Sequence, residues 1–457
     1  SKGELLKIDT ASRQVLAATP DLPTVKALAL SQDGSRLLAT RYISPQNWGV
    51  LWDVNTATMS LSRTIPLEQS IVPDDIDNGR GVPNYLASVL IDSEDQYAYV
   101  VGKKDNTGRG PINGNEALDD DNTVRTFAAK IDLAAGREDR QARIDFDNAD
   151  SPSAMALSPN GNYLFVALQG NNQVFLISRD PATGALGTTV SKLATGLAPQ
   201  GLLLDARNRN LYTKNYTDRS VTVVDVSGVL VGNVANPGSA DVATVSQETL
   251  PRDVLRGKQI FYNASFGLDE EGEFTGRMSA EGYLSCATCH QDGGQDGRVF
   301  DFTARGEGLR NNISLNGSSG NLHGNLHWSG NFDEVQDFEL DIRHRFLGRG
   351  LMDADSFDAT ADPLGASKAG YSEDLDALAA FVTSLDEGKV DRSPYREFDG
   401  AMTPSALAGA EIFRDRGCGE CHSGTAFTDG QLHNVGTVRE YSGSRLGDTL
   451  PGIVTPA

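Results

Sequence analysis

The sequence predicts a multidomain chain, with an all-β propeller in residues 1–247 and a mainly α module in residues 248–457. Three observations lead to this prediction. Short apolar segments separated by polar turns recur in the first part, where no helical period is found. Near Glu248 the pattern changes to amphipathic stretches, and all four cysteines lie beyond this point. At 457 residues the chain is also too long for one compact core.

The first part contains four copies of a pattern in which an apolar strand, a polar turn and further strands follow one another. They begin at Val25, Ala87, Ala154 and Gly201. Their turns contain Asp-Gly, Asn-Gly or similar residues because tight hairpins need positive φ at the central positions. Repeats of short antiparallel strands indicate the blades of a propeller. The pattern resembles the YVTN/WD40-like propeller repeat, with a β-sandwich as the structural alternative.

Two further features of the first part affect its completeness and its chemistry. Residues 3–9 resemble the last strands of a blade whose first half is absent. Only four to five blades are counted, near the lower limit for closing a ring, so we expect an incomplete propeller.

The insertion at residues 103–124 contains Asp119, Asp120 and Asp121. These carboxylates suit Ca²⁺, and a solvated loop is the alternative interpretation.

The second part is predicted to contain three helices, at residues 250–261, 372–385 and 405–414. Proline in the first turn favours the start of the first helix, and apolar residues at helical spacing give the second a face to bury. A Gly-x-x-Ile-Phe stretch occurs at residues 257–261 and again at 409–413. We therefore expect two related cytochrome c domains, at residues 248–400 and 401–457.

The cysteines form two Cys-x-x-Cys-His motifs, one at residues 286–290 and one at residues 418–422. This spacing is typical of c-type haem attachment, in which both thiols bond to one porphyrin and the histidine binds its iron. No cysteine remains for a disulfide or a zinc cluster. The sequence thus predicts two covalently bound haem c groups, held by six residues: Cys286, Cys289, His290, Cys418, Cys421 and His422.

Residues 250–457 resemble the bacterial dihaem cytochrome c peroxidase family. The matching segments, in order, are the first haem motif with Asp292-Gly293-Gly294, Leu309-Arg310-Asn311-Asn312, His327-Trp328-Ser329-Gly330-Asn331, the second haem motif, His433-Asn434-Val435-Gly436 and Asp448-Thr449-Leu450-Pro451. The resemblance implies that Trp328 lies between the haems and assists electron transfer, with a core tryptophan as the alternative. It also implies that Asn311 and the backbone near Thr455 hold a Ca²⁺ ion.

The chain departs from this family at the distal acid, since Leu351 precedes Met352 where the family has glutamate. Peroxide cleavage needs a group that moves a proton between the two oxygens. The candidates are His344, Gln336, Glu339 and Asp353. His344 is the most attractive because imidazole exchanges protons near neutral pH, although a surface or core histidine is an equal alternative. Candidate distal iron ligands are His327, His433 and Met278, and the second cytochrome domain is expected to be truncated.

These features predict a peroxidase-like oxidoreductase that takes electrons at one haem and reacts at the other. The alternative is a non-enzymatic electron-transfer or surface-assembly cytochrome whose propeller is a binding module. The partner expected is a small electron-donor or electron-acceptor protein, and the oligomeric state is open. A net charge of −22 argues against nucleic acid, and no apolar run is long enough to span a membrane. Covalent haem attachment occurs outside the bacterial cytoplasm, so we expect a periplasmic or extracellular protein.

Overall fold

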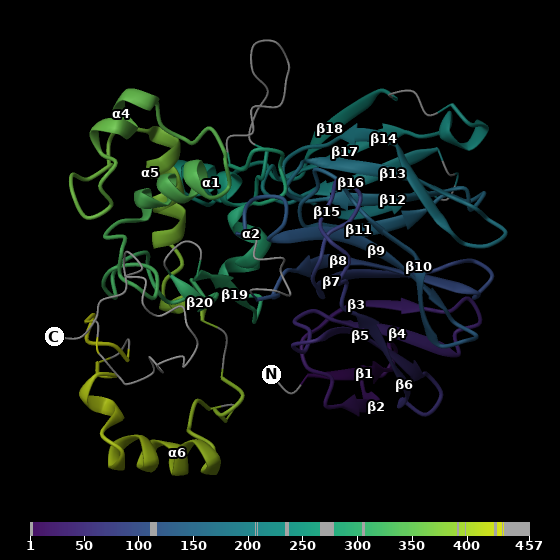
Figure 1. The fold of residues 1–457 in the computed structure, drawn as a ribbon. Helices are drawn as coiled ribbons and strands as arrows, with labels where there is room; N and C mark the ends of the chain where they lie inside the picture. The colour runs from purple at the N-terminus through teal and green to yellow at the C-terminus, as the bar shows by residue number, and fades with distance from the viewer. Residues whose placement is uncertain are drawn as a thin grey trace.

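The computed structural model describes residues 3–109, 117–205, 207, 209–233, 237–265, 278–303, 307–390, 393–397, 399–424, 427–431 and 433. Its two parts lie side by side, with the sheets of the N-terminal part next to the helices of the C-terminal part (Figure 1).

The N-terminal part contains four antiparallel sheets of four strands each, preceded by a two-stranded sheet. The two-stranded sheet pairs β1 (Glu4–Ile8) with β2 (Val15–Pro20). The first two complete sheets are β3 (Val25–Leu30), β4 (Arg36–Arg41), β5 (Trp48–Asn55) and β6 (Ser60–Glu68), then β7 (Val82–Ile91), β8 (Tyr97–Asp105), β9 (Val124–Asp132) and β10 (Arg137–Asp145). The other two are β11 (Pro152–Leu157), β12 (Tyr163–Leu168), β13 (Gln173–Arg179) and β14 (Leu186–Ala194), then β15 (Pro199–Leu204), β16 (Asn210–Asn215), β17 (Ser220–Asp225) and β18 (Ser239–Ala243).

These sheets are the blades of a β-propeller, as the repeats predicted. Their first strands, β3, β7, β11 and β15, pack against one another in chain order, and the sheets follow each other through space from β1 to β18 (Figure 1). The hairpin turns take the expected conformation, with φ values of +72° at Gly34, +54° at Asp95 and +69° at Gly161. A propeller of consecutive blades therefore replaces the alternative of a β-sandwich.

Hydrophobic cores lie between successive blades because neighbouring residues of a strand point to opposite faces of its sheet. In β8, Ala98 and Val100 belong to the core shared with the preceding blade, whereas Tyr99 and Val101 belong to the core shared with the next one. Phe165 in β12 likewise faces the following blade and is almost fully buried. Strands β8 and β12 are thus buried on both faces, which explains their long apolar stretches.

The C-terminal part contains short helices, a two-stranded sheet and irregular segments. Its α-helices are α1 (Arg252–Phe261), α2 (Cys286–Cys289), α3 (Phe338–His344), α4 (Ala354–Ala359), α5 (Glu373–Thr383) and α6 (Pro404–Asp415). The sheet pairs β19 (Val299–Phe302) with β20 (Gly308–Asn311). Single 3-10 turns occur here at η3 (Gln291–Gly293), η5 (Val335–Asp337), η6 (Glu387–Lys389) and η7 (Cys418–Glu420), and η2 (Val229–Val231) lies in the propeller between β17 and β18.

The three predicted helices are present as α1, α5 and α6. The Ser372 side chain caps α5 by accepting a hydrogen bond from the Leu375 amide, and Pro404 opens α6 after its cap Thr403. Helix α1 packs directly on α5, where a Cβ at Gly257 would lie 1.8 Å from the Ala377 carbonyl oxygen. Irregular chain separates these helices, so the expectation of a mainly α module is met only in part. No helix in the described ranges is long and apolar enough to cross a membrane.

Candidate haem-attachment sites

The first Cys-x-x-Cys-His motif begins with the single-turn helix α2, which contains both of its cysteines. Ser285 and Thr288 form a capping box, in which the Ser285 amide donates to Thr288 Oγ1 at 2.8 Å. The amide of His290 then donates to the Cys286 carbonyl at 3.0 Å. Both thiols are free, and burial raises the pKa of the Cys286 thiol to about 12. At neutral pH this thiol is therefore protonated and is not poised as a nucleophile.

His290 has the hydrogen bonding expected of an iron ligand. Its Nδ1 lies 3.1 Å from the carbonyl oxygen of Gly294, four residues further on. Burial lowers the pKa of His290, which favours the neutral ring. A neutral imidazole that donates from Nδ1 presents the lone pair of Nε2, and metal-binding histidines are commonly oriented in this way.

The second motif repeats this arrangement at the surface. Turn η7 carries Cys418, and His422 Nδ1 lies 3.0 Å from the Phe427 carbonyl oxygen, five residues further on. Helix α6, just before it, has no buried residue. The residues at both motifs therefore fit covalent haem, because each offers two free thiols and an imidazole held through Nδ1.

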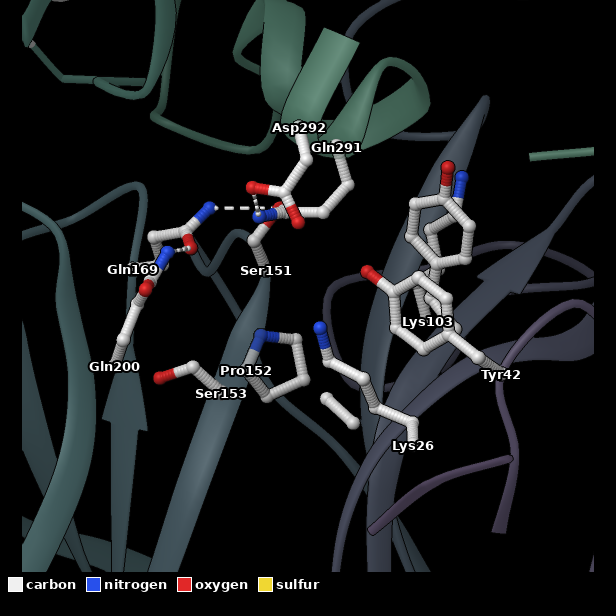
Figure 2. Close-up of a pocket in the computed structure, with 12 residues that line it drawn as sticks. Lys26, Tyr42, Lys103, Ser151, Pro152, Ser153, Gln169, Gln200, Gln291 and Asp292 are labelled. Atoms are coloured by element: carbon white, nitrogen blue, oxygen red, sulfur yellow. Dashed lines mark hydrogen bonds between the residues drawn. The ribbon is translucent and has the colours of Figure 1, made fainter. Parts of the chain in front are cut away.

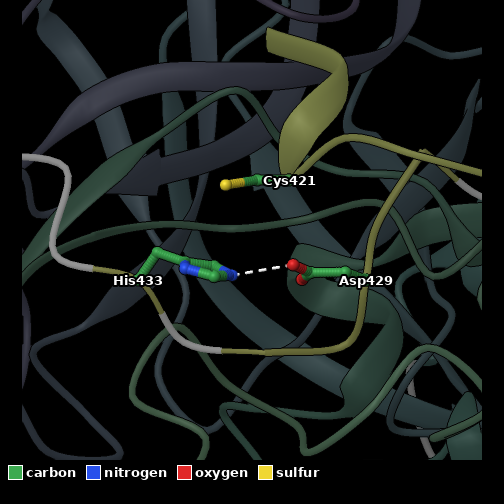
Figure 3. Close-up of side chains that lie close together, drawn as sticks. All are labelled: Cys421, Asp429 and His433. Atoms are coloured by element: carbon green, nitrogen blue, oxygen red, sulfur yellow. Dashed lines mark hydrogen bonds and ion pairs between the residues drawn. The ribbon is translucent and has the colours of Figure 1, made fainter. Parts of the chain in front are cut away.

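His433, a predicted distal ligand, lies beside the second motif. Its Nε2 is 2.8 Å from Asp429 Oδ2, and these groups lie within 4.8 Å of the Cys421 sulfur and of one another (Figure 3). The hydrogen bond to His433 contributes to lowering the pKa of Asp429, after the larger effect of the Gln431 amide.

The propeller contributes directly to the first motif through Asp150, a feature that sequence reasoning missed. Asp150 is 1% exposed, and its carboxylate accepts hydrogen bonds of 2.7 Å from the hydroxyls of Ser285 and Thr288. Tyr85, on β7, donates its hydroxyl to the Cys289 carbonyl at 3.1 Å. Both contacts hold the segment that contains the cysteines against the propeller.

A buried ion-pair network lies beside these contacts. Lys103 Nζ is 2.9 Å from Asp105 and 2.8 Å from Asp296, and Arg298 Nε is 3.2 Å from Asp105. All four side chains are at most 2% exposed. Burial acts to lower the pKa of Lys103, but the carboxylates of Asp105 and Asp296 raise it above its ordinary value. Two cations and two anions therefore neutralise each other across the junction between propeller and haem motif.

The residues predicted to act on the distal side lie in different environments. Trp328 is 56% exposed, and its Nε1 donates to the Asn311 carbonyl at 2.7 Å, so two predicted site residues are in contact. His327 lies 2.9 Å from Asn331 Oδ1 through Nδ1 and 3.7 Å from Asp341 through Nε2. His344 is exposed, with its ring 5.7 Å from that of Phe357.

The other candidates are partly engaged in the protein interior. Gln336 donates from Nε2 to Asp376 at 2.9 Å, and Met278 is buried in the core that also contains Leu351 and Met352. Glu339 is fully buried, and its carboxylate accepts from the backbone amides of those same two residues and from Arg343. Asp353 caps α4. Thr455 lies outside the described residues.

The acidic insertion brings its three carboxylates together, with ligand oxygens of Asp119, Asp120 and Asp121 within 4.8 Å of one another. Burial, and then Asp121, raises the pKa of both Asp119 and Asp120 to about 6. The shift arises first from burial and then from the neighbouring Asp121 carboxylate, and by itself it does not establish a cation site.

A polar cavity of about 110 Å³ lies between the propeller and the segment after His290 (Figure 2). Lys26, Tyr42 and Gln200 line it from the propeller, and Gln291 and Asp292 line it from the C-terminal part.

Comparisons with known proteins agree with the N-terminal fold. Residues 51–200 match the model of the lactonase family, described as a seven-bladed β-propeller. This match lies within the blades described above. The N-terminal part is a β-propeller.

Two curated relatives are subunits of one enzyme from Kuenenia stuttgartiensis. Hydrazine synthase subunit gamma is 30% identical over 175 residues, which are 35% of this chain and 45% of the relative. Subunit beta is 26% identical over 111 residues, which are 20% of this chain and 29% of the relative. The chain thus spans less than half the length of either relative. A solved Kuenenia stuttgartiensis hydrazine synthase structure aligns with a TM-score of 0.38 at 16% identity, covering 48% of this chain and 64% of that one.

Proposed function

We propose that the chain is an exported dihaem c-type cytochrome that acts as a peroxidase-like oxidoreductase. The observation that carries the proposal is the repeated geometry at His290 and His422. In both motifs two free thiols precede an imidazole whose Nδ1 is paired with a backbone carbonyl oxygen. Such a pair orients the ring and leaves Nε2 for iron.

Bound haem would supply one-electron redox chemistry, and the protein sets its ligation, access and electrostatics. Cys286 and Cys289 would hold one haem and Cys418 and Cys421 the other. The first site is the more enclosed, since Asp150 of the propeller accepts from its hydroxyl side chains and Tyr85 donates to its backbone. The second is exposed, which suits exchange of electrons with a small partner protein. We therefore assign electron entry to the second site and reaction with substrate to the first.

Similarity to hydrazine synthase subunit gamma supports an enzymatic role, because that relative is by name a subunit of an enzyme. It also suggests small nitrogen compounds as a substrate class to test beside peroxide.

The second candidate is a cytochrome that only transfers electrons. It is favoured by the position of His344, the preferred distal acid–base group, which is exposed and makes no hydrogen bond within the described residues. A proton relay needs a group held within hydrogen-bond reach of its substrate, often by a partner.

His327 is better oriented for a proton relay than His344, because Asn331 and Asp341 lie at its two ring nitrogens.

Stepwise reduction of the purified protein, followed by absorption and EPR spectroscopy, tests the proposal. We expect two haems of different potential, and a spectral change when peroxide is added to the half-reduced protein. His327→Gln should slow that reaction while His344→Gln leaves it within about twofold. Two six-coordinate low-spin haems whose spectra do not change on addition of peroxide in any redox state would instead support the electron-transfer candidate.

A further inference from the structure

The cavity beside the first haem motif has the features of a ligand site. It is lined by residues of the successive inner strands β3, β7, β11 and β15, and Gln291 and Asp292 close it from the C-terminal part (Figure 2). Its volume of about 110 Å³ is well above the roughly 10–15 Å³ that a cavity needs to hold one water molecule. It therefore suits a small molecule of a few non-hydrogen atoms.

One side of the cavity offers an uncompensated cation and a hydroxyl donor. The Lys26 ammonium lies 4.8 Å from the centre of the Tyr42 ring and forms no ion pair with any described residue. The Tyr42 ring is fixed by stacking on Tyr85, with centroids 4.2 Å apart and planes 6° apart. Its hydroxyl has no protein partner in the described ranges, and Figure 2 shows this hydroxyl and the ammonium directed into the cavity. Lys103 contributes no net charge, because Asp105 and Asp296 neutralise it.

The opposite side offers acceptors, because a chain of amides is oriented in one direction. Gln200 Nε2 donates to Gln169 Oε1 at 2.7 Å, and Gln169 Nε2 donates to Gln291 Oε1 at 3.0 Å. Gln291 Nε2 then donates to Asp292 Oδ1 at 3.3 Å. This direction leaves Gln200 Oε1 as an acceptor at the start of the chain.

Asp292 adds a negative charge at the end of this chain. Its Oδ1 also accepts from the Tyr262 hydroxyl at 2.9 Å, whereas Oδ2 receives no hydrogen bond from the described part of the protein. No described lysine or arginine forms an ion pair with it. The cavity therefore has a cationic donor side and an anionic acceptor side that are not paired with each other.

We propose that this cavity binds a small zwitterion of the size of glycine or alanine. Its carboxylate would accept from Lys26 and Tyr42, and its ammonium group would donate to Asp292 and Gln200. Because Gln291 and Asp292 directly follow His290, binding should change the spectrum of the first haem. Only this spectroscopic consequence rests on the proposed function; the binding itself does not.

Calorimetric titration of the purified full chain with glycine, acetate and methylammonium tests the site. We expect glycine to bind, and acetate and methylammonium, which each carry one of its charges, to bind at least tenfold more weakly. Lys26→Met and Asp292→Asn should each weaken glycine binding at least tenfold. Lys192→Met is the matched control. The Lys192 ammonium also lies over an aromatic ring, 4.6 Å from the ring centre, but Lys192 does not line the cavity, so this variant should leave the affinity for glycine unchanged.

The outcomes separate this proposal from the proposed function. Absence of glycine binding, or glycine binding that Lys26→Met leaves intact, overturns the zwitterion site even if both haems are attached and redox-active. Equal affinity for acetate and glycine overturns it in favour of a simple anion site. Glycine binding that needs Lys26 and Asp292, in a chain without attached haem, supports the site and contradicts the proposed function.

Discussion

The carboxylate of Asp150 joins the propeller to the first Cys-x-x-Cys-His motif. It is buried among hydroxyls of Ser151, Ser285 and Thr288, each 2.7 Å away. Burial raises its pKa, and these hydrogen bonds act in the opposite direction. A buried hydroxyl that loses its acceptor costs about 1–3 kcal/mol, so the two contacts to the haem motif should be important for stability.

Replacing Asp150 by alanine should therefore lower the free energy of unfolding by about 2–4 kcal/mol, as measured by denaturant titration. Asp180→Ala is the control, because Asp180 also accepts from a hydroxyl, that of Thr183 at 2.8 Å, but both residues are exposed. The free energy of unfolding of this control variant should fall by less than about 1 kcal/mol. Similar losses in the two variants would show that Asp150 has no special role.

The acidic insertion predicts that the stability of the folded chain depends on pH. The pKa of Asp120 is about 6 in the folded chain, above the value of about 4 for an unfolded aspartate. Between these values the folded state binds more protons, so the contribution of Asp120 to stability falls as pH rises from 4 to 6 and stays low above it. Asp120→Asn should raise the melting temperature at pH 7.5 and have little effect at pH 4. An increase of equal size at both pH values would exclude the charge as the cause.

At the scale of elements, the propeller depends on the cores between its blades. Phe165→Ala should cost about 3–5 kcal/mol because this ring fills the core between the third and fourth complete blades. Leu203→Ala is the control, since Leu203 is in the adjacent blade but 65% exposed. We expect it to change stability by less than about 0.5 kcal/mol in the same denaturation assay.

The apolar segments of the repeats predict the inner and central strands of the blades, including β3 and β15, which are only half-buried. The central strands β4, β8 and β12 carry apolar runs because each contacts two blades, whereas β16 is more polar. The outer strands β6, β10, β14 and β18 were missed since they are largely exposed and polar, as in Leu186–Ala194 and Ser239–Ala243. Strand β9 was missed because the insertion at residues 103–124 separates it from the rest of its repeat.

The candidate sites show a similar difference: residues close together in the sequence could be predicted, whereas contacts between distant residues could not. The two Cys-x-x-Cys-His motifs are contiguous in sequence, so their spacing alone predicts Cys286 to His290 as a candidate site. Asp150 lies about 135 residues earlier and reaches the motif only through the fold. Its sequence surroundings are those of an ordinary blade turn, and no local pattern distinguishes it. The cavity could not be predicted for the same reason, since it combines residues of several blades with Gln291 and Asp292.

Across the whole molecule, buried charges connect the two parts, and we expect these parts to unfold as one cooperative unit. Lys103→Met would leave Asp105 and Asp296 with one cation between them, and breaking a buried ion pair costs about 3–5 kcal/mol. We expect the variant to unfold earlier, still in one transition seen both by fluorescence and by circular dichroism. Arg140→Met, which removes an exposed ion pair with Glu68, should cost less than about 1 kcal/mol. Separate transitions in the unmodified protein would show that the two parts unfold independently.

Covalent haem at both Cys-x-x-Cys-His motifs is the basis of the proposed function. Intact mass measurement of the denatured protein, produced with export and haem-attachment machinery, tests for it. We expect a mass increase equal to two haem groups, with one group lost in a Cys286→Ser, Cys289→Ser variant and the other in a Cys418→Ser, Cys421→Ser variant. A mass equal to that of the polypeptide alone, with four free thiols, would contradict it.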